Sequence, residues 1–126
     1  MQDYRNLETW QVAHSLAVEI YKVTERFPKS ELYGLTSQLR RAAVSIAANI
    51  AEGTGRRTDP GTRHFLEIAS GSASEVDYLL LLARDLELLT SESHAKLDPP
   101  TQSVRRLLNG FIRRLRQGRI GPSGSR

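Results

Sequence analysis

The fold is decided by residues 35–54, which read LTSQLRRAAVSIAANIAEGT. An apolar stripe recurs there at spacings of three and four residues: Leu35, Leu39, Ala43, Ile46 and Ile50. This spacing puts the stripe on one face of a helix, which Gly55 then ends. Residues 42–51 carry no charge, and eight of these ten are Ala, Val or Ile. Because so apolar a helix must be covered on more than one side, and a small bundle covers only one, the stretch predicts an oligomer.

Two further helical patterns flank this stretch. The first spans residues 7–27 and stops at Pro28, because proline lacks a backbone donor and restricts the residue before it. The second starts at Thr58 or Asp59, either of which can cap a helix with proline in its first turn. It continues to about Leu89.

The last helical pattern begins after Pro100 and ends near Gln117. No strand pattern competes with the four helices, and the links between them are short. We therefore expect an all-α protein: an antiparallel up-down four-helix bundle that forms a single domain over residues 1–117. Residues 118–126, with three Gly, two Ser and one Pro, should form a flexible tail.

The helical pattern that starts at Thr58 or Asp59 has a run of small residues in its middle, residues 69–74, and Gly71 is among them. Glycine inside a helix costs about 1 kcal/mol relative to alanine. A helix that keeps it therefore predicts a close approach of another backbone, either within the bundle or between chains.

The composition excludes several classes of protein. The chain has 126 residues and a mass of 14.1 kDa, which suits one domain with one core. It has no cysteine, so disulfides, zinc–thiolate clusters and thiol catalysis are excluded. The N-terminus lacks the pattern of a secretory signal, and the longest apolar run, residues 79–83, is too short to cross a bilayer. We therefore expect a cytoplasmic protein without a membrane partner.

Residues suited to catalysis or metal binding are few. His64 and Glu67 have the spacing of half a carboxylate-bridged metal site, but such a site needs paired motifs and further glutamates on other helices. The run Gly53-Thr54-Gly55 is too short for a phosphate loop. No serine stands at a spacing from a histidine that suggests activation. The sequence therefore predicts no enzyme, no catalytic residue, no metal site and no cofactor.

A polar line crosses the apolar helix at Arg41, Ser45, Asn49 and Glu52. Because a lone buried charge is costly, the favoured interpretation is a salt bridge, internal or between subunits, that fixes register. The other interpretation is a polar channel or a face that contacts a ligand. Arg40 should point to a different partner, such as Glu75 or Asp77. The predicted structural or inter-subunit polar residues are Arg40, Arg41, Asn49, Glu52 and Glu75.

Charge is strongly segregated along the sequence. The net charge is +4, but residues 64–98 sum to −5 and residues 99–126 to +7. Segregation of this kind indicates either self-association or a polyanionic partner. Fifteen of the 18 cations are arginine, whose planar guanidinium suits phosphate; a general preference of the genome for arginine explains this count equally well.

The last helix has a cationic face opposite its apolar face. Such a face can bind the phosphates of RNA or DNA, and it lacks the interleaved aromatic side chains that would stack on bases. The candidate nucleic-acid-binding residues are Arg56, Arg57, Arg105, Arg106, Arg113 and Arg116. Two alternatives remain open: a solvated surface, or a surface that meets the acidic third helix of a neighbouring chain. A scaffold that recruits a protein partner and carries an incidental basic surface is the competing function.

Several blocks of the sequence resemble one known family. The opening Tyr4-Arg5-Asn6-Leu7 with Trp10-Gln11, the run YGLTSQLRRAAVSI at residues 33–46 and the run NIAEG at residues 49–53 resemble the bacterial four-helix bundle proteins called 23S ribosomal RNA intervening-sequence proteins. Phe65-Leu66 and Gly71-Ser72-Ala73-Ser74-Glu75 resemble the third-helix signature of that family. Departures are small: Ala47 stands where many members carry proline, Asn6 where aspartate is common, and residues 58–63 lack the usual aromatic and basic run.

The resemblance implies an assembly and a partner. It implies a homopentamer, a barrel with a central channel, which agrees with the excess apolar surface of residues 42–51. Some members are encoded within ribosomal RNA intervening sequences, and their function is unknown. The accessory proteins of diversity-generating retroelements are similar, and they bind nucleic acid and a reverse transcriptase through basic surfaces. The resemblance thus implies structured RNA or DNA as a partner and supplies no catalytic residue.

Overall fold

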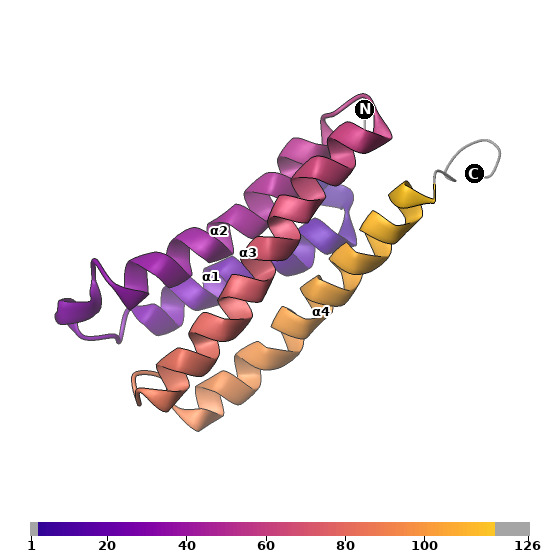
Figure 1. The fold of residues 1–126 in the computed structure, drawn as a ribbon. Coiled ribbons are helices and arrows are strands. Elements are labelled where there is room, and N and C mark those ends of the chain that lie inside the picture. The colour runs from indigo at the N-terminus through magenta and orange to yellow at the C-terminus, as the bar shows by residue number, and fades with distance from the viewer. Residues whose placement is uncertain (1–2, 118–126) are drawn as a thin grey trace.

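The structure is a computed structural model that describes residues 3–117, and within that range it contains helices and no strand. The four long helices are α1 (Glu8–Thr24), α2 (Leu35–Thr54), α3 (Asp59–Asp85) and α4 (Ser91–Arg116). Short 3-10 turns, η1 (Tyr4–Asn6) and η2 (Lys29–Glu31), precede α1 and α2. Figure 1 shows the helices alternating in direction along one long axis. The expected all-α four-helix architecture is confirmed, and the expected flexible tail lies outside the described residues.

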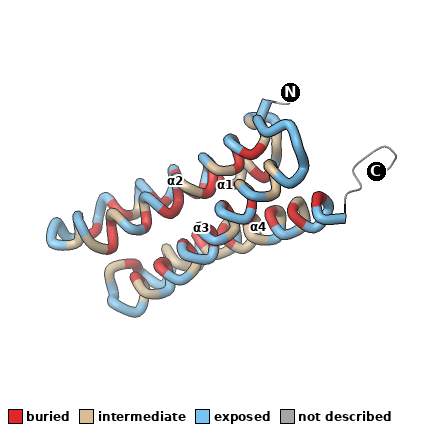
Figure 2. The backbone as a smooth tube through the Cα atoms, turned by 45° about the horizontal axis from the view of Figure 1, so that its top comes forward, coloured by how far each residue is buried: buried red, intermediate tan, exposed pale blue. Residues whose placement is uncertain are grey.

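The helices surround one core in sequence order. Each helix packs against its neighbours in the chain, and α1 also packs against α4, which closes the bundle. The largest fully buried side chains come from all four helices and include Leu16, Ile20, Leu39, Ile46, Ile50, Leu66, Leu80 and Leu108. Figure 2 shows the buried positions facing inward on every helix. Burial of each such side chain contributes about 1.5–3 kcal/mol, so this core accounts for the fold.

The closest backbone approach at a glycine lies between α2 and α3, at Gly53. A Cβ there would come within 3.2 Å of both the Phe65 Cβ and the Thr62 carbonyl oxygen. At Gly71, in contrast, a Cβ would meet nothing within 4 Å. The expected close approach at Gly71 therefore does not occur within this chain.

The end of α3 differs from the sequence expectation. The helix stops at Asp85, because Glu87 adopts a left-handed conformation with a φ of 62°. The Leu88 amide then donates to the Ala83 carbonyl at 2.9 Å, and the Glu87 amide donates to the Arg84 carbonyl at 2.9 Å. These two bonds are those of a Schellman motif, with glutamate at the position that glycine usually occupies.

The start of α4 is a second correction, since the helix begins at Ser91 and contains Pro99 and Pro100. The Thr90 hydroxyl caps the new start by accepting a hydrogen bond from the Ser93 amide at 3.0 Å. The two prolines leave the carbonyls of residues 95 and 96 without an intrahelical donor, but both residues are exposed, so water can hydrate them. Burial of Leu97 on the same turn holds this part of the helix against the core.

None of the helices in residues 3–117 is long and apolar enough to cross a membrane.

Candidate nucleic-acid interface

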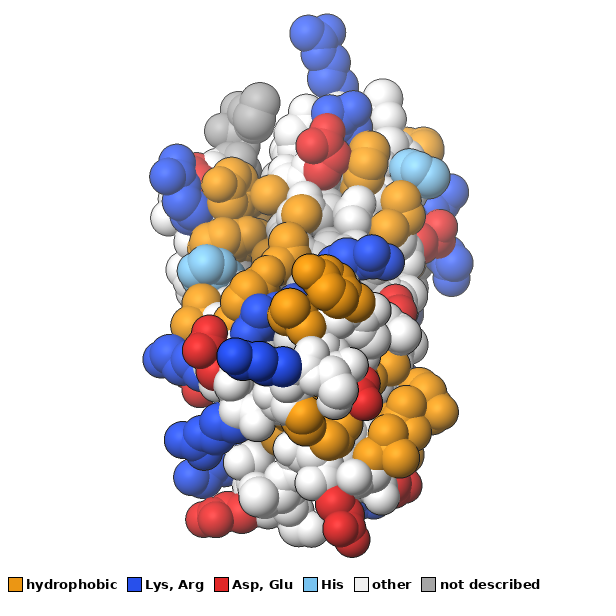
Figure 3. Space-filling view, turned by 90° about the vertical axis from the view of Figure 1, so that its left-hand side faces the viewer, with side chains coloured by type: hydrophobic (Ala, Val, Ile, Leu, Met, Phe, Trp, Pro, Cys, Tyr) orange, Lys and Arg blue, Asp and Glu red, His pale blue; other side chains and the backbone are white. Residues whose placement is uncertain are grey.

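Because the helices pack antiparallel, charges that are segregated along the sequence become segregated along the long axis of the bundle. The start of α1, the end of α2, the first half of α3 and the second half of α4 meet at one end of the bundle, here called the basic end (Figure 1). Seven arginines lie there: Arg5, Arg56, Arg57, Arg63, Arg113, Arg114 and Arg116; Arg105 and Arg106 lie near the middle of α4. Five carboxylates accompany them: Asp3, Glu8, Glu52, Asp59 and Glu67. The opposite half holds nine carboxylates and seven Lys or Arg side chains, and acidic side chains are visible at its tip, the lower end in Figure 3.

Three of the six predicted nucleic-acid-binding arginines form ion pairs within the chain. Their carboxylate partners are Glu52 for Arg56 at 2.6 Å, Asp77 for Arg105 at 3.1 Å and Glu67 for Arg116 at 3.1 Å.

The other three are Arg57, Arg106 and Arg113, and for them the described part of the chain provides no carboxylate within 4.0 Å. Arg57 and Arg113 are exposed, and Arg106 is exposed with one guanidinium nitrogen on the Ser103 hydroxyl. These three side chains are therefore available to an anion.

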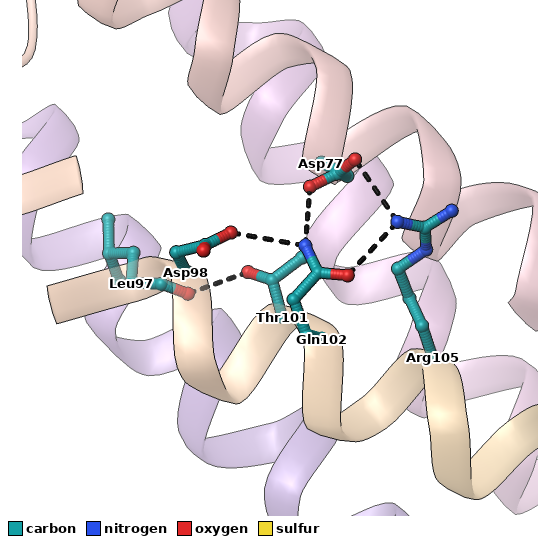
Figure 4. A network of polar contacts seen from close by, with 6 residues as sticks. All are labelled: Asp77, Leu97, Asp98, Thr101, Gln102 and Arg105. Atoms are coloured by element: carbon teal, nitrogen blue, oxygen red, sulfur yellow. Dashed lines mark hydrogen bonds and ion pairs between the residues drawn. The ribbon is translucent and has the colours of Figure 1, made fainter. Parts of the chain in front are cut away.

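Arg105 belongs to a polar network that joins α3 to α4 (Figure 4). Its Nη1 donates to Asp77 Oδ2 and to Gln102 Oε1, both at 3.1 Å. The Gln102 amide donates in turn to Asp77 at 2.7 Å and to Asp98 at 3.1 Å. This network closes the α3/α4 seam toward the acidic end. Arg105 thus joins α3 to α4, a role that could not be predicted from the sequence.

The seam is open toward the basic end. A groove of about 470 Å³, here called the α3/α4 groove, is lined by Glu67, Ser70, Asn109, Ile112, Arg113 and Arg116. Glu67 is bonded to Arg116 and lies 3.9 Å from the Arg63 Nε. The groove thus combines two guanidinium groups with a hydroxyl and an amide, all of which can donate to anionic oxygens.

The polar line on α2 is held by hydrogen bonds. Asn49 Nδ2 donates to the Ser45 carbonyl at 2.9 Å and to its hydroxyl at 3.0 Å. The Ser72 hydroxyl on α3 also donates to the Ser45 hydroxyl, at 2.8 Å, which links the two helices. Arg41 is exposed and lies in no ion pair of the described chain, while Glu52 binds Arg56. Within the chain, Arg41 and Glu52 thus form no salt bridge with each other and neutral contacts join Ser45 to Asn49; a salt bridge between subunits stays a prediction.

Arg40 lies against α1, so the expectation that it faces Glu75 or Asp77 is wrong. Its Nε donates to the Thr24 hydroxyl at 2.8 Å, and its guanidinium lies 4.5 Å from the centre of the Tyr21 ring. The position of Arg40 on α2 turns its side chain away from α3, where Glu75 is exposed.

A second groove, between α1 and α2, is almost entirely apolar. It has a volume of about 560 Å³ and is here called the α1/α2 groove, lined by Tyr4, Trp10, His14, Ala17, Val18, Tyr21, Lys22, Val44, Ala47, Ala48 and Ala51. The Trp10 and His14 rings stack with their centres 4.8 Å apart. Figure 3 shows hydrophobic side chains gathered on this side of the molecule. The α1 wall was missed from the sequence, although the spacing of Trp10, His14, Val18 and Tyr21 is that of a helix face.

Residues 3–117 contain no group of three or more His, Cys, Asp or Glu side chains that could hold a metal ion. Near the start of the described chain, the hydrogen bond from the Arg5 side chain lowers the pKa of the Asp3 carboxyl. The same bond raises the pKa of Arg5.

Fold and surface together define a small helical bundle with a polar seam, an apolar groove and separated charge. The family of 23S rRNA-intervening sequence proteins matches residues 5–110, and the chain belongs to this family. Among solved structures it is similar to a protein of unknown function from the S23 ribosomal protein family of Bacteroides thetaiotaomicron. That similarity has a TM-score of 0.75 and 25% sequence identity, and it covers 82% of this chain and 97% of the other. No curated protein matches the chain.

Proposed function

We propose that the protein is a non-enzymatic, homopentameric bundle of the cytoplasm that binds the backbone of structured RNA or DNA through its basic ends. The axial separation of charge is the observation that carries this proposal. It gathers arginines from η1, the α2–α3 turn, α3 and α4 on one end, where copies in a ring would present them repeatedly. Weak phosphate contacts on linked subunits reinforce each other through effective concentration.

The α1/α2 groove supports self-assembly. Val18, Tyr21 and Val44 on its walls are 39%, 44% and 46% exposed, which leaves a contiguous apolar surface open in a single chain. A surface of this kind marks an interaction site. Residues 42–51 predict an oligomer, and we therefore propose that a second copy of the chain covers this groove. The number of copies, five, comes from the resemblance to the family.

The double variant Arg113→Glu with Arg116→Glu tests the nucleic-acid part. We expect it to lower the affinity for a labelled structured RNA and to flatten the dependence on salt, because each lost phosphate contact reduces the salt slope by about one. The native mass should not change. The matched control is Lys29→Glu with Lys96→Glu, which makes the same charge change on exposed residues of the opposite end.

Equal losses in both double variants would show that net charge alone sets the affinity. Unchanged binding in the arginine variant would remove α4 from the interface.

A further inference from the structure

The lining of the α3/α4 groove has the composition of a phosphate-binding site. Asn109, Arg113 and Arg116 follow at spacings of four and three residues, so they share one face of α4. Ser70 and Glu67 face them from α3, and the buried side chain of Ile112 forms part of the floor. Except for Glu67 and Ile112, every lining side chain can donate a hydrogen bond to a phosphate oxygen.

We propose that this groove binds one phosphodiester of the nucleic acid, and that Glu67 is an internal competitor which the phosphate displaces from Arg116. The proposal rests on the proposed nucleic-acid function and adds to it a location and a built-in restraint. Arg113 is exposed and has no carboxylate partner in the described chain, so it is available for the first contact.

The Glu67–Arg116 pair is well suited to such an exchange. The two side chains are 44% and 63% exposed, and surface ion pairs of this kind are weak. When a phosphate replaces the carboxylate, Arg116 keeps an anionic partner, and its planar fork fits phosphate as well as it fits carboxylate. Arg63 lies 3.9 Å from Glu67 and can keep that carboxylate paired after it leaves Arg116.

The other ion pair along the same seam lacks these properties. Asp77 and Arg105 are each 37% exposed, and Gln102 is bonded to both of them. Loss of the Asp77 charge would leave Arg105 bonded to Gln102, and Arg105 is not part of the α3/α4 groove lining. Asp77→Asn therefore changes the net charge of the chain by the same amount as Glu67→Gln without opening a phosphate site, which makes it the matched control.

The experiment measures the affinity of the full chain for a fluorescently labelled structured RNA hairpin across a salt series. Glu67→Gln should raise the affinity by about three- to tenfold at low salt and steepen the salt slope by about one, because one more phosphate is neutralised. Asp77→Asn should stay within about twofold of the parent protein, because the half-buried Asp77 lies outside the groove. Arg113→Gln should weaken binding in both the parent and the Glu67→Gln background.

Equal gains in Glu67→Gln and Asp77→Asn would overturn the groove as a site while leaving the proposed function in place. Absence of RNA binding by the parent protein at low salt would overturn both. A second experiment distinguishes a phosphodiester of nucleic acid from a free phosphate ion. Inorganic phosphate is titrated into the protein, and the NMR signals of the arginine Nε–H groups are followed. Shifts confined to Arg113 and Arg116, together with RNA binding, support the phosphodiester. The same shifts without RNA binding would overturn it in favour of a small free anion.

Discussion

Two glycines in the α2/α3 hairpin should respond in opposite directions to the same substitution. At Gly71, which is exposed in the middle of α3, the added methyl group meets nothing within 4 Å. Gly71→Ala should therefore raise the free energy of unfolding by about 0.5–1 kcal/mol, the difference in helix propensity between the two residues.

At Gly53 the added methyl group would lie 3.2 Å from the Thr62 carbonyl oxygen and 3.2 Å from the Phe65 Cβ. Neither atom belongs to a flexible side-chain end, so α3 itself must shift. That shift also strains the bond of 3.0 Å from the Thr62 hydroxyl to the Gly53 carbonyl. Overpacking costs about 1–3 kcal/mol, and the gain in propensity offsets up to about 1 kcal/mol, so Gly53→Ala should lower the free energy of unfolding by about 1 kcal/mol.

Urea unfolding followed by circular dichroism measures both variants. The comparison is made at one protein concentration, because assembly adds to apparent stability. Equal stabilisation by the two substitutions would refute the close packing of α2 on α3 at Gly53. Loss of stability in Gly71→Ala, together with a lower native mass, would place Gly71 at a contact between chains instead.

Three further outcomes follow from the corrected helix ends and from the apolar groove. Glu87→Gly should raise the free energy of unfolding by about 1 kcal/mol, because glycine adopts the left-handed conformation without the Cβ cost; thermal unfolding would show a decrease if the motif were absent. Thr90→Ala should cost about 1 kcal/mol by removing the cap of α4, and an unchanged urea midpoint would argue that α4 begins later, as the sequence suggested. Ala48→Glu should lower the native mass toward that of one chain, whereas Ala95→Glu, on an exposed position of α4, should not; a mass unchanged by Ala48→Glu would exclude the groove from assembly.

Helix positions could be predicted where local signals agreed. The bounds Leu35–Thr54 of α2 and the Thr58 cap of α3 match the sequence expectation, because an apolar stripe and a capping side chain are both local features. The start of α4 could not be predicted from Pro99 and Pro100. The rule against proline inside a helix was outweighed by the Thr90 cap and by the burial of Leu97.

The candidate site was only partly visible in the sequence. Clustering of arginine in residues 99–117 predicted a basic face, but it did not show which guanidinium groups are already paired. Asp77 lies 28 residues from Arg105, and Glu67 lies 49 residues from Arg116, so both pairs exist only through the packing of α3 on α4. The α1/α2 groove likewise needs two helices to form its walls.

The dependence of RNA binding on salt tests the central claim most directly. Fluorescence anisotropy of a labelled structured RNA, titrated with the full chain at low and at physiological salt, should show affinity that falls steeply as salt rises. Such a fall would show that cationic side chains contact phosphates, and the two double variants would then test whether these lie at the basic end. Absence of binding even at low salt would contradict the account, and it would direct attention to a protein partner at the α1/α2 groove.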